Sequence, residues 1–345
     1  MKTLKHFYNT ADITREEILA LINMALKMKN GQFTKDLNGK SLAMLFFNPS
    51  LRTRVSFSVA MQKLGGLAID LPIKDGTYSL EFEEGAVMDQ GTIEHVKDAA
   101  KVLSGYCDAV AVRGSDLITS TKESAEVSTW DELKTDKVIK SFMNYANVPV
   151  INMESNVYHP CQGLADAMTI KEKLGDTAGK KYVLTWVYHP KALPMATPNS
   201  QILAACDLGM EVVVARPLGW ELDSQIIDSM TQRARQNGGS LKFLNSMEEA
   251  MQGGNVVCAK SWGALYYYGN WKEEQKIRGG LKNWIVDQKK MDMTNNAYFM
   301  HCLPVRRNVE VTDEVIDGNN SWVYDQAENR LHVQKAILIR LLKRK

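Results

Sequence analysis

The chain has 345 residues, about twice the size of an average domain, which predicts two domains. Forty-two Lys and Arg against 40 Asp and Glu give a formal net charge of +2, so no long-range field favours nucleic acid or an anionic membrane surface. Hydrophobic residues make up 45% of the chain and charged residues 24%, values that are ordinary for a globular protein and exclude a disordered one.

Cysteine usage and apolar runs indicate the compartment. The longest apolar runs, such as residues 41–47, have only the length of a strand, and the residues after Met1 are polar, so we expect no membrane span and no export signal. The five cysteines form an odd set with no Cys-x-x-Cys pair, which argues against a disulfide framework or a zinc knuckle. The sequence therefore predicts a cytoplasmic protein that binds no metal.

Apolar periodicity predicts alternating helices and strands along the chain. A capping-box pattern at Thr14 opens a first helix, and Gly65 ends a second helix that begins near Arg54. Later helices are expected at residues 94–105, 136–146, 162–174 and 327–342. Strands are expected at residues 42–47, 67–71, 108–113, 148–153, 182–187, 211–215, 255–260 and 298–303. This rhythm is typical of the α/β class, with two doubly wound lobes built on parallel sheets.

The predicted division falls near Met153, giving domains at residues 1–153 and 154–326, with a final helix at about 327–345 packing back on the first lobe. Ligands of open α/β sheets bind beyond the carboxyl ends of the strands, so we expect the active site in the cleft between the lobes. The chain contains neither Gly-x-Gly-x-x-Gly after a strand nor a P-loop pattern, which weakens dehydrogenase and P-loop interpretations.

Polar residues follow the strand at residues 42–47 directly. Ser50 and Thr53 offer hydroxyl groups there, Arg52 offers a guanidinium suited to phosphate oxygens, and a helix start offers unpaired backbone N–H groups. This pattern indicates an anion site, although the arginines could equally be solvated helix charges.

Two further strand ends carry polar residues. His159 and Gln162 follow the strand at residues 148–153, where His159 could bind a carbonyl oxygen and Gln162 an amide. A His before a Pro is more often a local cap, and we interpret Cys161 as inert packing. His301 and Cys302 follow the strand at 298–303; a free Cys is commonly a buried hydrophobe, but here Pro and two arginines follow it, which is typical of a site wall.

These strand ends carry a resemblance to a known family. Ser-Leu-Arg-Thr-Arg at residues 50–54, His-Pro-Cys-Gln at 159–162 and His-Cys-Leu-Pro at 301–304, in this order, resemble the aspartate/ornithine carbamoyltransferase family, and the match runs from about Thr14 to Leu342. The resemblance implies transfer of a carbamoyl group from carbamoyl phosphate to an amine, with no cofactor and no metal. It implies carbamoyl phosphate contacts from Ser50, Leu51, Arg52, Thr53, Tyr78, Arg113, His159, Gln162, Cys302, Leu303 and Arg330.

The resemblance also assigns roles within that set. Thr53, Arg113 and His159 match donors to the carbonyl oxygen, and Cys302 matches a residue that orients the amine. Tyr78 stands in a loop that in the family reaches the site of a neighbouring subunit, which implies a homotrimer with shared sites. Acetyl-specific members carry Trp at this position, and an exposed loop tyrosine is the alternative.

Residues 181–186, 259–265 and 328–334 resemble the branch of the family that acts on N-acetylornithine in arginine biosynthesis. Glu154, Lys260 and Leu303 match contacts to the N-acylornithine, and Arg306 adds a second cation for its carboxylate. The loop between Glu154 and His159 has one residue more than the pattern of this branch. Glu310 stands where a lysine can occur, so no role of that lysine carries over.

Ile93 leaves the acyl group of the acceptor open. Acetyl-specific members carry Glu there, whose charge would repel a succinyl carboxylate, whereas Ile93 repels nothing and binds no carboxylate. The resemblance favours N-acetylornithine, with N-succinylornithine as the alternative and plain ornithine third, because the Ser-Met-Gly loop of ornithine enzymes is missing. The remaining alternative is a non-catalytic anion-binding protein that has lost turnover. Such a protein is expected to have degraded motifs, yet the residues of the three motifs are intact.

Overall fold

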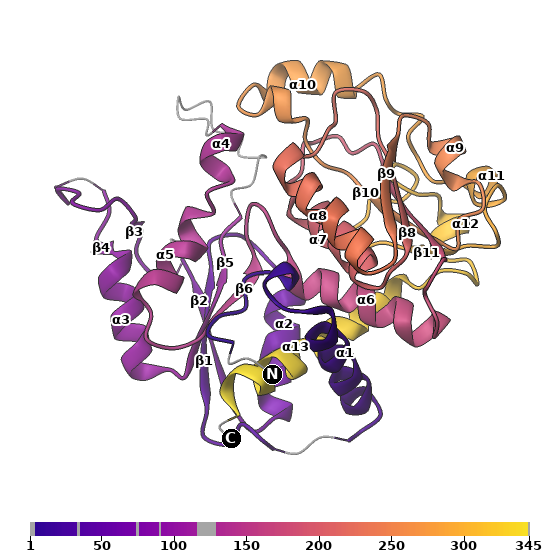
Figure 1. Cartoon of the computed structure of the whole chain (residues 1–345). Helices are drawn as coiled ribbons and strands as arrows, with labels where there is room; N and C mark the ends of the chain where they lie inside the picture. Colours follow the sequence, from indigo (N-terminus) through magenta and orange to yellow (C-terminus); the bar gives the residue numbers. More distant parts are fainter. Residues whose placement is uncertain (1–3, 33–34, 74–75, 90, 116–128, 344–345) are drawn as a thin grey trace. The chain divides into compact units, whose positions relative to one another are not determined.

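The protein folds into two compact units, each with its own parallel β-sheet. The structure, a computed structural model, describes residues 4–32, 35–73, 76–89, 91–115 and 129–343 (Figure 1). Unit 1 comprises Met1–Asp116, Leu133–Cys161 and Arg330–Lys345, and unit 2 comprises Leu117–Glu132 and Gln162–Asn329. The predicted α/β class with parallel sheets in two domains is confirmed. The predicted functional division at residues 1–153 and 154–326 stays a prediction.

The sheet of unit 1 has four strands in the order β2 (Leu67–Pro72), β1 (Ser41–Phe46), β5 (Ala109–Arg113) and β6 (Val150–Glu154), all parallel. Parallel strands place their carboxyl ends at one edge. Two backbone hydrogen bonds tie these ends together: Phe47 N–H donates to the Arg113 carbonyl at 2.9 Å, and Gly114 N–H donates to the Glu154 carbonyl at 2.9 Å. Polar residues that follow these strands are therefore held beside one another.

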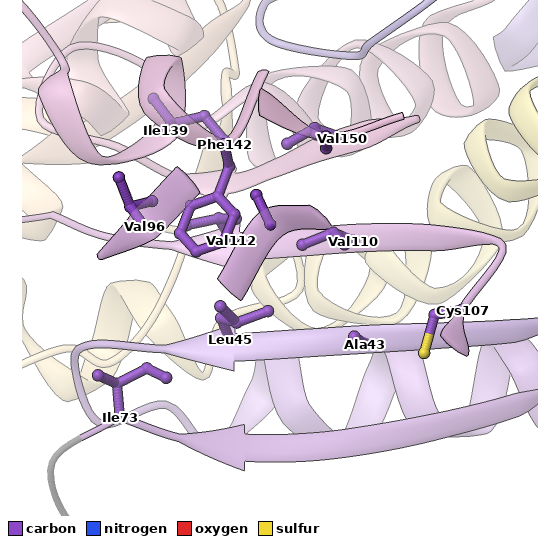
Figure 2. Close-up of a cluster of buried hydrophobic side chains, with 12 residues drawn as sticks. Ala43, Leu45, Ile73, Val96, Cys107, Val110, Val112, Ile139, Phe142 and Val150 are labelled. Atoms are coloured by element: carbon purple, nitrogen blue, oxygen red, sulfur yellow. The ribbon is translucent and has the colours of Figure 1, made fainter. Parts of the chain in front are cut away.

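Helices α3 (Val96–Tyr106) and α5 (Lys137–Tyr145) cover one face of this sheet. Val96 of α3 and Phe142 of α5 pack against Leu45 and Val112 of the strands (Figure 2).

The carboxyl-terminal helix is linked to the first long helix, because Arg340 donates a 2.8 Å hydrogen bond to Glu17. The helices with residues in unit 1 are η1 (Thr10–Asp12), α1 (Arg15–Lys29), α2 (Arg52–Lys63), α3 (Val96–Tyr106), α4 (Trp130–Leu133), α5 (Lys137–Tyr145), α6 (Pro160–Leu174) and α13 (Val323–Leu342), and a small parallel pair is β3 (Leu80–Glu81) with β4 (Glu94–His95).

The sheet of unit 2 has five parallel strands in the order β11 (Tyr298–Met300), β10 (Val256–Lys260), β7 (Lys181–Trp186), β8 (Glu211–Ala215) and β9 (Ser240–Leu244). Its remaining helices are α7 (Ala196–Asp207), α8 (Ser224–Gln236), α9 (Met247–Met251), η2 (Leu265–Tyr267), α10 (Trp271–Arg278), α11 (Gln288–Met291) and α12 (Asp313–Ile316). In the described part of the chain, no helix combines the length and the apolar character that crossing a membrane requires.

Two strands of unit 2 differ from the sequence-based expectation. β9 was not predicted, because it is a half-buried edge strand whose residues lack the continuous apolar run of the central strands. β11 was predicted to extend to residue 303 but ends at Met300. Leu303 has a φ of 53°, a left-handed conformation that no strand residue adopts.

Candidate active site

Thr53 is the centre of a cationic group at the carboxyl edge of the unit 1 sheet. Its side chain is 1% exposed, and its Oγ1 accepts hydrogen bonds from Arg330 Nη2 at 2.6 Å and from Arg113 Nη1 at 3.5 Å. Thr53 lies in the first turn of α2, where backbone N–H groups have no intrahelical acceptor. Strand β1 delivers the start of α2, β5 delivers Arg113 at its last residue, and α13 delivers Arg330.

The positive charges of Arg52 and Arg113 act on Arg330. Burial, together with the positive charges of Arg113 and Arg52, lowers the pKa of Arg330 to about 10, against the opposing effects of Cys161 and Glu154. Guanidinium groups that repel one another are stabilised by an anion placed between them. We name Arg52, Thr53, Arg113 and Arg330 the arginine cluster; its charge and helix start suit a small dianion.

Glu154 joins this cluster from the end of β6. It forms an ion pair with Arg113, and its Oε2 lies 3.7 Å from Nε2 of His159, which precedes α6. Both Glu154 and His159 are buried. The sequence assigned Glu154 to the amino-acid substrate; the structure places it against two residues assigned to the carbonyl group, and its predicted role stays a prediction.

Tyr78 and Ile93 lie beside the small pair β3 and β4. Ile93 N–H donates to the Ser79 carbonyl at 3.2 Å, so the segments that carry Tyr78 and Ile93 run next to each other. The Glu94 carboxylate raises the pKa of the Tyr78 hydroxyl through a hydrogen bond. Ile93 is 69% exposed and Tyr78 is about half exposed. Ser50 is half-buried and Leu51 is exposed at the start of α2.

The second set of predicted residues lies in unit 2, at the ends of β10 and β11. Lys260 is the last residue of β10 and is buried. Arg306 donates from Nε to His189 Nε2 at 3.0 Å, and its backbone N–H donates to Glu310 at 2.6 Å. These contacts join Arg306 to two residues, His189 and Glu310, to which the sequence assigned no role.

Glu310 is a buried anion in this set. Burial alone raises its pKa, but the interactions with His301, with Lys260 and with the Arg306 N–H outweigh burial and lower the pKa to about 2. His301 Nε2 lies 3.8 Å from its Oε1. The carboxylate therefore faces Lys260 with a full negative charge at neutral pH, and it holds the segment after Leu303 through Arg306.

Gln162 and Cys161 occupy the start of α6. Gln162 is 1% exposed, and its Nε2 donates to Asp166 at 2.7 Å, while the described residues offer no hydrogen-bond donor to its Oε1. That oxygen suits an incoming N–H group. Burial raises the pKa of the Cys161 thiol to about 12, so this cysteine is unreactive. Cys302 is also buried.

Arg278 organises the segment after Lys260, and no sequence motif pointed to it. Its side chain is 1% exposed, pairs with Glu274 in α10, and donates to Ser261 Oγ and to the Trp262 carbonyl, both at 3.0 Å. Glu274 in turn accepts from the backbone N–H of Ala264 at 3.3 Å. The sequence around Arg278 resembles that of an exposed helix. The role of Arg278 becomes visible only from its partners Ser261 and Trp262, which are distant in the chain.

Metal-ligating side chains do not gather in the part of the molecule that the structure describes: no group of three or more His, Cys, Asp or Glu is placed to hold a metal ion.

Comparison with known proteins agrees with this geometry. Residues 5–172 match the carbamoyl-P binding domain of aspartate/ornithine carbamoyltransferase, and residues 195–341 match the Asp/Orn binding domain. The chain is 45% identical over 343 residues to N-acetylornithine carbamoyltransferase of Xanthomonas campestris pv. campestris, covering 99% of this chain and 98% of that one.

Two solved structures are similarly close. Acetylornithine transcarbamylase complexed with acetylcitrulline matches with a TM-score of 0.94 and 45% identity, over 99% of this chain and 100% of that chain. A variant of N-acetyl-L-ornithine transcarbamylase in which a glutamate is replaced by valine, complexed with carbamyl phosphate and N-succinyl-L-norvaline, matches with a TM-score of 0.93 and 45% identity, over 98% and 100%.

Proposed function

Because the chain belongs to the aspartate/ornithine carbamoyltransferase family, we propose that it transfers the carbamoyl group of carbamoyl phosphate to the δ-amine of N-acetylornithine. The products are N-acetylcitrulline and phosphate, which places the reaction in arginine biosynthesis. The observation that carries the proposal is the convergence of Arg113 and Arg330 on Thr53 at the start of α2. This arrangement suits a small doubly charged phosphate.

In the proposed site, different residues bind the phosphate, the carbonyl oxygen and the NH₂ group of carbamoyl phosphate. Ser50, Arg52 and the N–H groups at the start of α2, including that of Leu51, bind the phosphate. Thr53, Arg113 and His159 donate to the carbonyl oxygen, which gains negative charge as the amine attacks, so these donors stabilise the transition state more than the ground state. The carbamoyl NH₂ is bound by Gln162 and the carbonyls of Cys302 and Leu303, and Arg330 and Tyr78 complete the set.

Glu154 changes partner in this proposal. In the described structure it pairs with Arg113. When carbamoyl phosphate binds, Arg113 turns to the carbonyl oxygen, and the Glu154 carboxylate becomes available to an N–H group of the N-acylornithine. This exchange reconciles its contact with Arg113 and its predicted role toward the second substrate.

The acceptor amine attacks in its neutral form, because an ammonium group has no lone pair. Lys260 and Arg306 bind the substrate carboxylate, Leu303 contacts the substrate through its backbone, and Cys302 orients the amine. The leaving phosphate takes the proton that the amine releases. Proximity of two bound substrates supplies much of the rate, and no covalent intermediate on the enzyme is needed.

Ile93 favours a second candidate acceptor, N-succinylornithine. A glutamate at this position would repel the free succinyl carboxylate, and an isoleucine removes that repulsion. A relative in which a glutamate is replaced by valine, an apolar β-branched residue like isoleucine, is complexed with an N-succinyl analogue. Ile93 does not itself bind a carboxylate, so acetyl remains the first proposal.

We further propose a homotrimer with shared sites in the cytoplasm. β2 is an edge strand, Leu67 is 60% exposed on it, and Leu51 and Val55 of α2 are exposed as well. Such an apolar edge is typical of an interface. The five cysteines are free and buried, which suits a reducing compartment.

One assay tests the proposed reaction. The purified chain is incubated with carbamoyl phosphate and, separately, with N-acetylornithine, N-succinylornithine and ornithine, and both the ureido product and free phosphate are measured. We expect the highest kcat/KM with N-acetylornithine. A higher kcat/KM with N-succinylornithine would make that compound, and not N-acetylornithine, the acceptor. Absence of product from all three compounds would overturn the proposed reaction.

A further inference from the structure

The loop of residues 155–158 connects Glu154, at the end of β6, to His159, directly before α6. Both flanking residues belong to the site proposed above, so the shape of the loop sets the distance and angle between them. By the resemblance seen in the sequence, it is one residue longer than the pattern of the N-acetylornithine branch, and residues of this chain stabilise its conformation.

Asp136 supplies that stabilisation. Its side chain is 1% exposed, and its two oxygens accept four hydrogen bonds. Oδ1 accepts from the backbone N–H groups of Asn156 at 2.9 Å and Val157 at 3.3 Å. Oδ2 accepts from Ser155 Oγ at 2.6 Å and from the Tyr8 hydroxyl at 2.7 Å. Three of the four donors lie in the loop.

The loop is closed from its other side by Asn152 of β6. Its Nδ2 donates to Ser155 Oγ at 3.2 Å and to the Tyr8 carbonyl at 3.0 Å. Ser155 N–H donates to the Tyr158 carbonyl at 2.9 Å, which closes the loop into a turn. Asp136 is itself fixed, because it has a φ of 53° directly before α5 and donates from its N–H to the Leu133 carbonyl at 3.1 Å.

We propose that Asp136 is a positioning residue of the transferase site: it fixes the loop of residues 155–158 and thereby the placement of His159 relative to Glu154. This inference rests on the proposed function, and it gives Asp136 no contact with either substrate.

Asp136→Asn leaves a single, uncharged acceptor oxygen. The bonds from the N–H groups of Asn156 and Val157 to that oxygen are weaker than bonds to a carboxylate, and the amide NH₂ faces the Ser155 and Tyr8 hydroxyls, which donate to Oδ2 in the parent.

The test compares Asp136→Asn with Asp108→Asn. Asp108 is a matched control in the same unit, because its carboxylate accepts from Lys40 Nζ at 2.6 Å and from Ser41 N–H at 2.9 Å at the opposite, amino end of β1. Both variants are assayed below their unfolding temperatures. We expect kcat to fall by about 10- to 100-fold in Asp136→Asn, since a displacement of order 1 Å costs up to about 100-fold. In Asp108→Asn it stays within about twofold, as expected for a site remote from the chemistry.

Two further readouts separate positioning from general loss of structure. Inorganic phosphate binding, measured by calorimetry, stays unchanged in Asp136→Asn, because Ser50, Arg52 and Thr53 are untouched. Amide hydrogen exchange at Asn156 and Val157 becomes faster in Asp136→Asn and not in Asp108→Asn.

The outcomes distinguish the inference from the proposed function. Unchanged exchange at Asn156 and Val157, a kcat of Asp136→Asn within twofold of the parent, or an equal loss of kcat in both variants would overturn the positioning role. A parent chain without turnover on any acceptor would overturn the proposed function, and with it this role in catalysis.

Discussion

At the scale of single residues, the arginine cluster shows how neighbouring arginines take different tasks. Arg52 and Arg54 are separated by one residue in α2, yet Arg54 pairs with Asp70 and lies 4.1 Å over the Phe46 ring, whereas Arg52 adds to the field at Arg330. Successive helix positions point in different directions, so the two side chains face different surroundings. Arg54 is therefore held by Asp70 and Phe46, whereas the proposed function assigns Arg52 to the anion.

We expect Arg52→Ala to lose at least about 100-fold in turnover while its circular dichroism spectrum and unfolding temperature stay close to those of the parent, because a charged donor to the phosphate is removed. Arg54→Ala is the matched control and should retain turnover, with a small loss of stability. Near-parental rates of Arg52→Ala at saturating carbamoyl phosphate would contradict the assignment.

Glu310 makes an acid-dependent contribution to stability. Its pKa in the folded chain is about 2, below the value of about 4.3 for an unperturbed glutamate. A depressed pKa contributes stability that is fully present above about pH 4.3 and is lost as pH falls towards 2. Glu310→Gln should therefore be less stable than the parent at pH 7, with a gap that narrows as the pH falls through this window.

Urea unfolding across pH 7 to 2.5 measures this dependence. Glu273→Gln, which removes an exposed carboxylate paired with Lys276, serves as the control and should follow the parental profile. A gap between Glu310→Gln and the parent that does not change with pH would show that the charge of Glu310 is not what stabilises the fold.

At the scale of elements, α10 holds the segment that follows β10 through hydrogen bonds from Arg278 and to Glu274. The ion pair of Arg278 and Glu274 is completely buried, so removal of one partner leaves an uncompensated charge, which costs about 3–5 kcal/mol. We expect Arg278→Met to lose stability of this order and to raise KM for the N-acylornithine, because Ser261 and Trp262 next to Lys260 lose their donor.

The double variant Arg278→Met with Glu274→Leu removes both charges and should recover a large part of the stability in urea unfolding, since replacing both partners by apolar residues is often neutral. KM should remain raised, because the hydrogen bonds to residues 261–264 stay absent. If the double variant is no more stable than the single one, the charge left on Glu274 is not the cause of the loss.

At the scale of the whole molecule, the exposed apolar edge around β2 leads to a prediction about assembly. We expect the chain to sediment at about three times its 38.8 kDa mass, and Leu67→Glu with Ile69→Glu to sediment as a single chain, because charges at the edge oppose pairing. Leu218→Glu changes an apolar residue of unit 2 that is 73% exposed, more than Leu67 or Ile69, and should leave the mass unchanged. A parent chain that sediments as a monomer would contradict the trimer.

The sequence by itself predicted most strands of the two sheets, several of the long helices and the order in which they occur. Buried parallel strands are continuous apolar runs, and amphipathic helices repeat with a period near 3.6, so both are visible in a short window of sequence. The motifs at residues 50–54, 159–162 and 301–304 were found for the same reason, since each is contiguous and follows a strand. Edge strand β9 was missed because it is only half-buried.

The tertiary structure alone decided which of these residues meet. Arg330 contacts Thr53 across 277 positions, Asp136 fixes a loop twenty residues later in the chain, and Arg278 binds the segment that follows Lys260. A local pattern records burial and periodicity, whereas contacts across such separations depend on strand order in the sheet and on helix packing. The sequence therefore predicted the chemistry available to the site, and folding determined how its charges are paired and held.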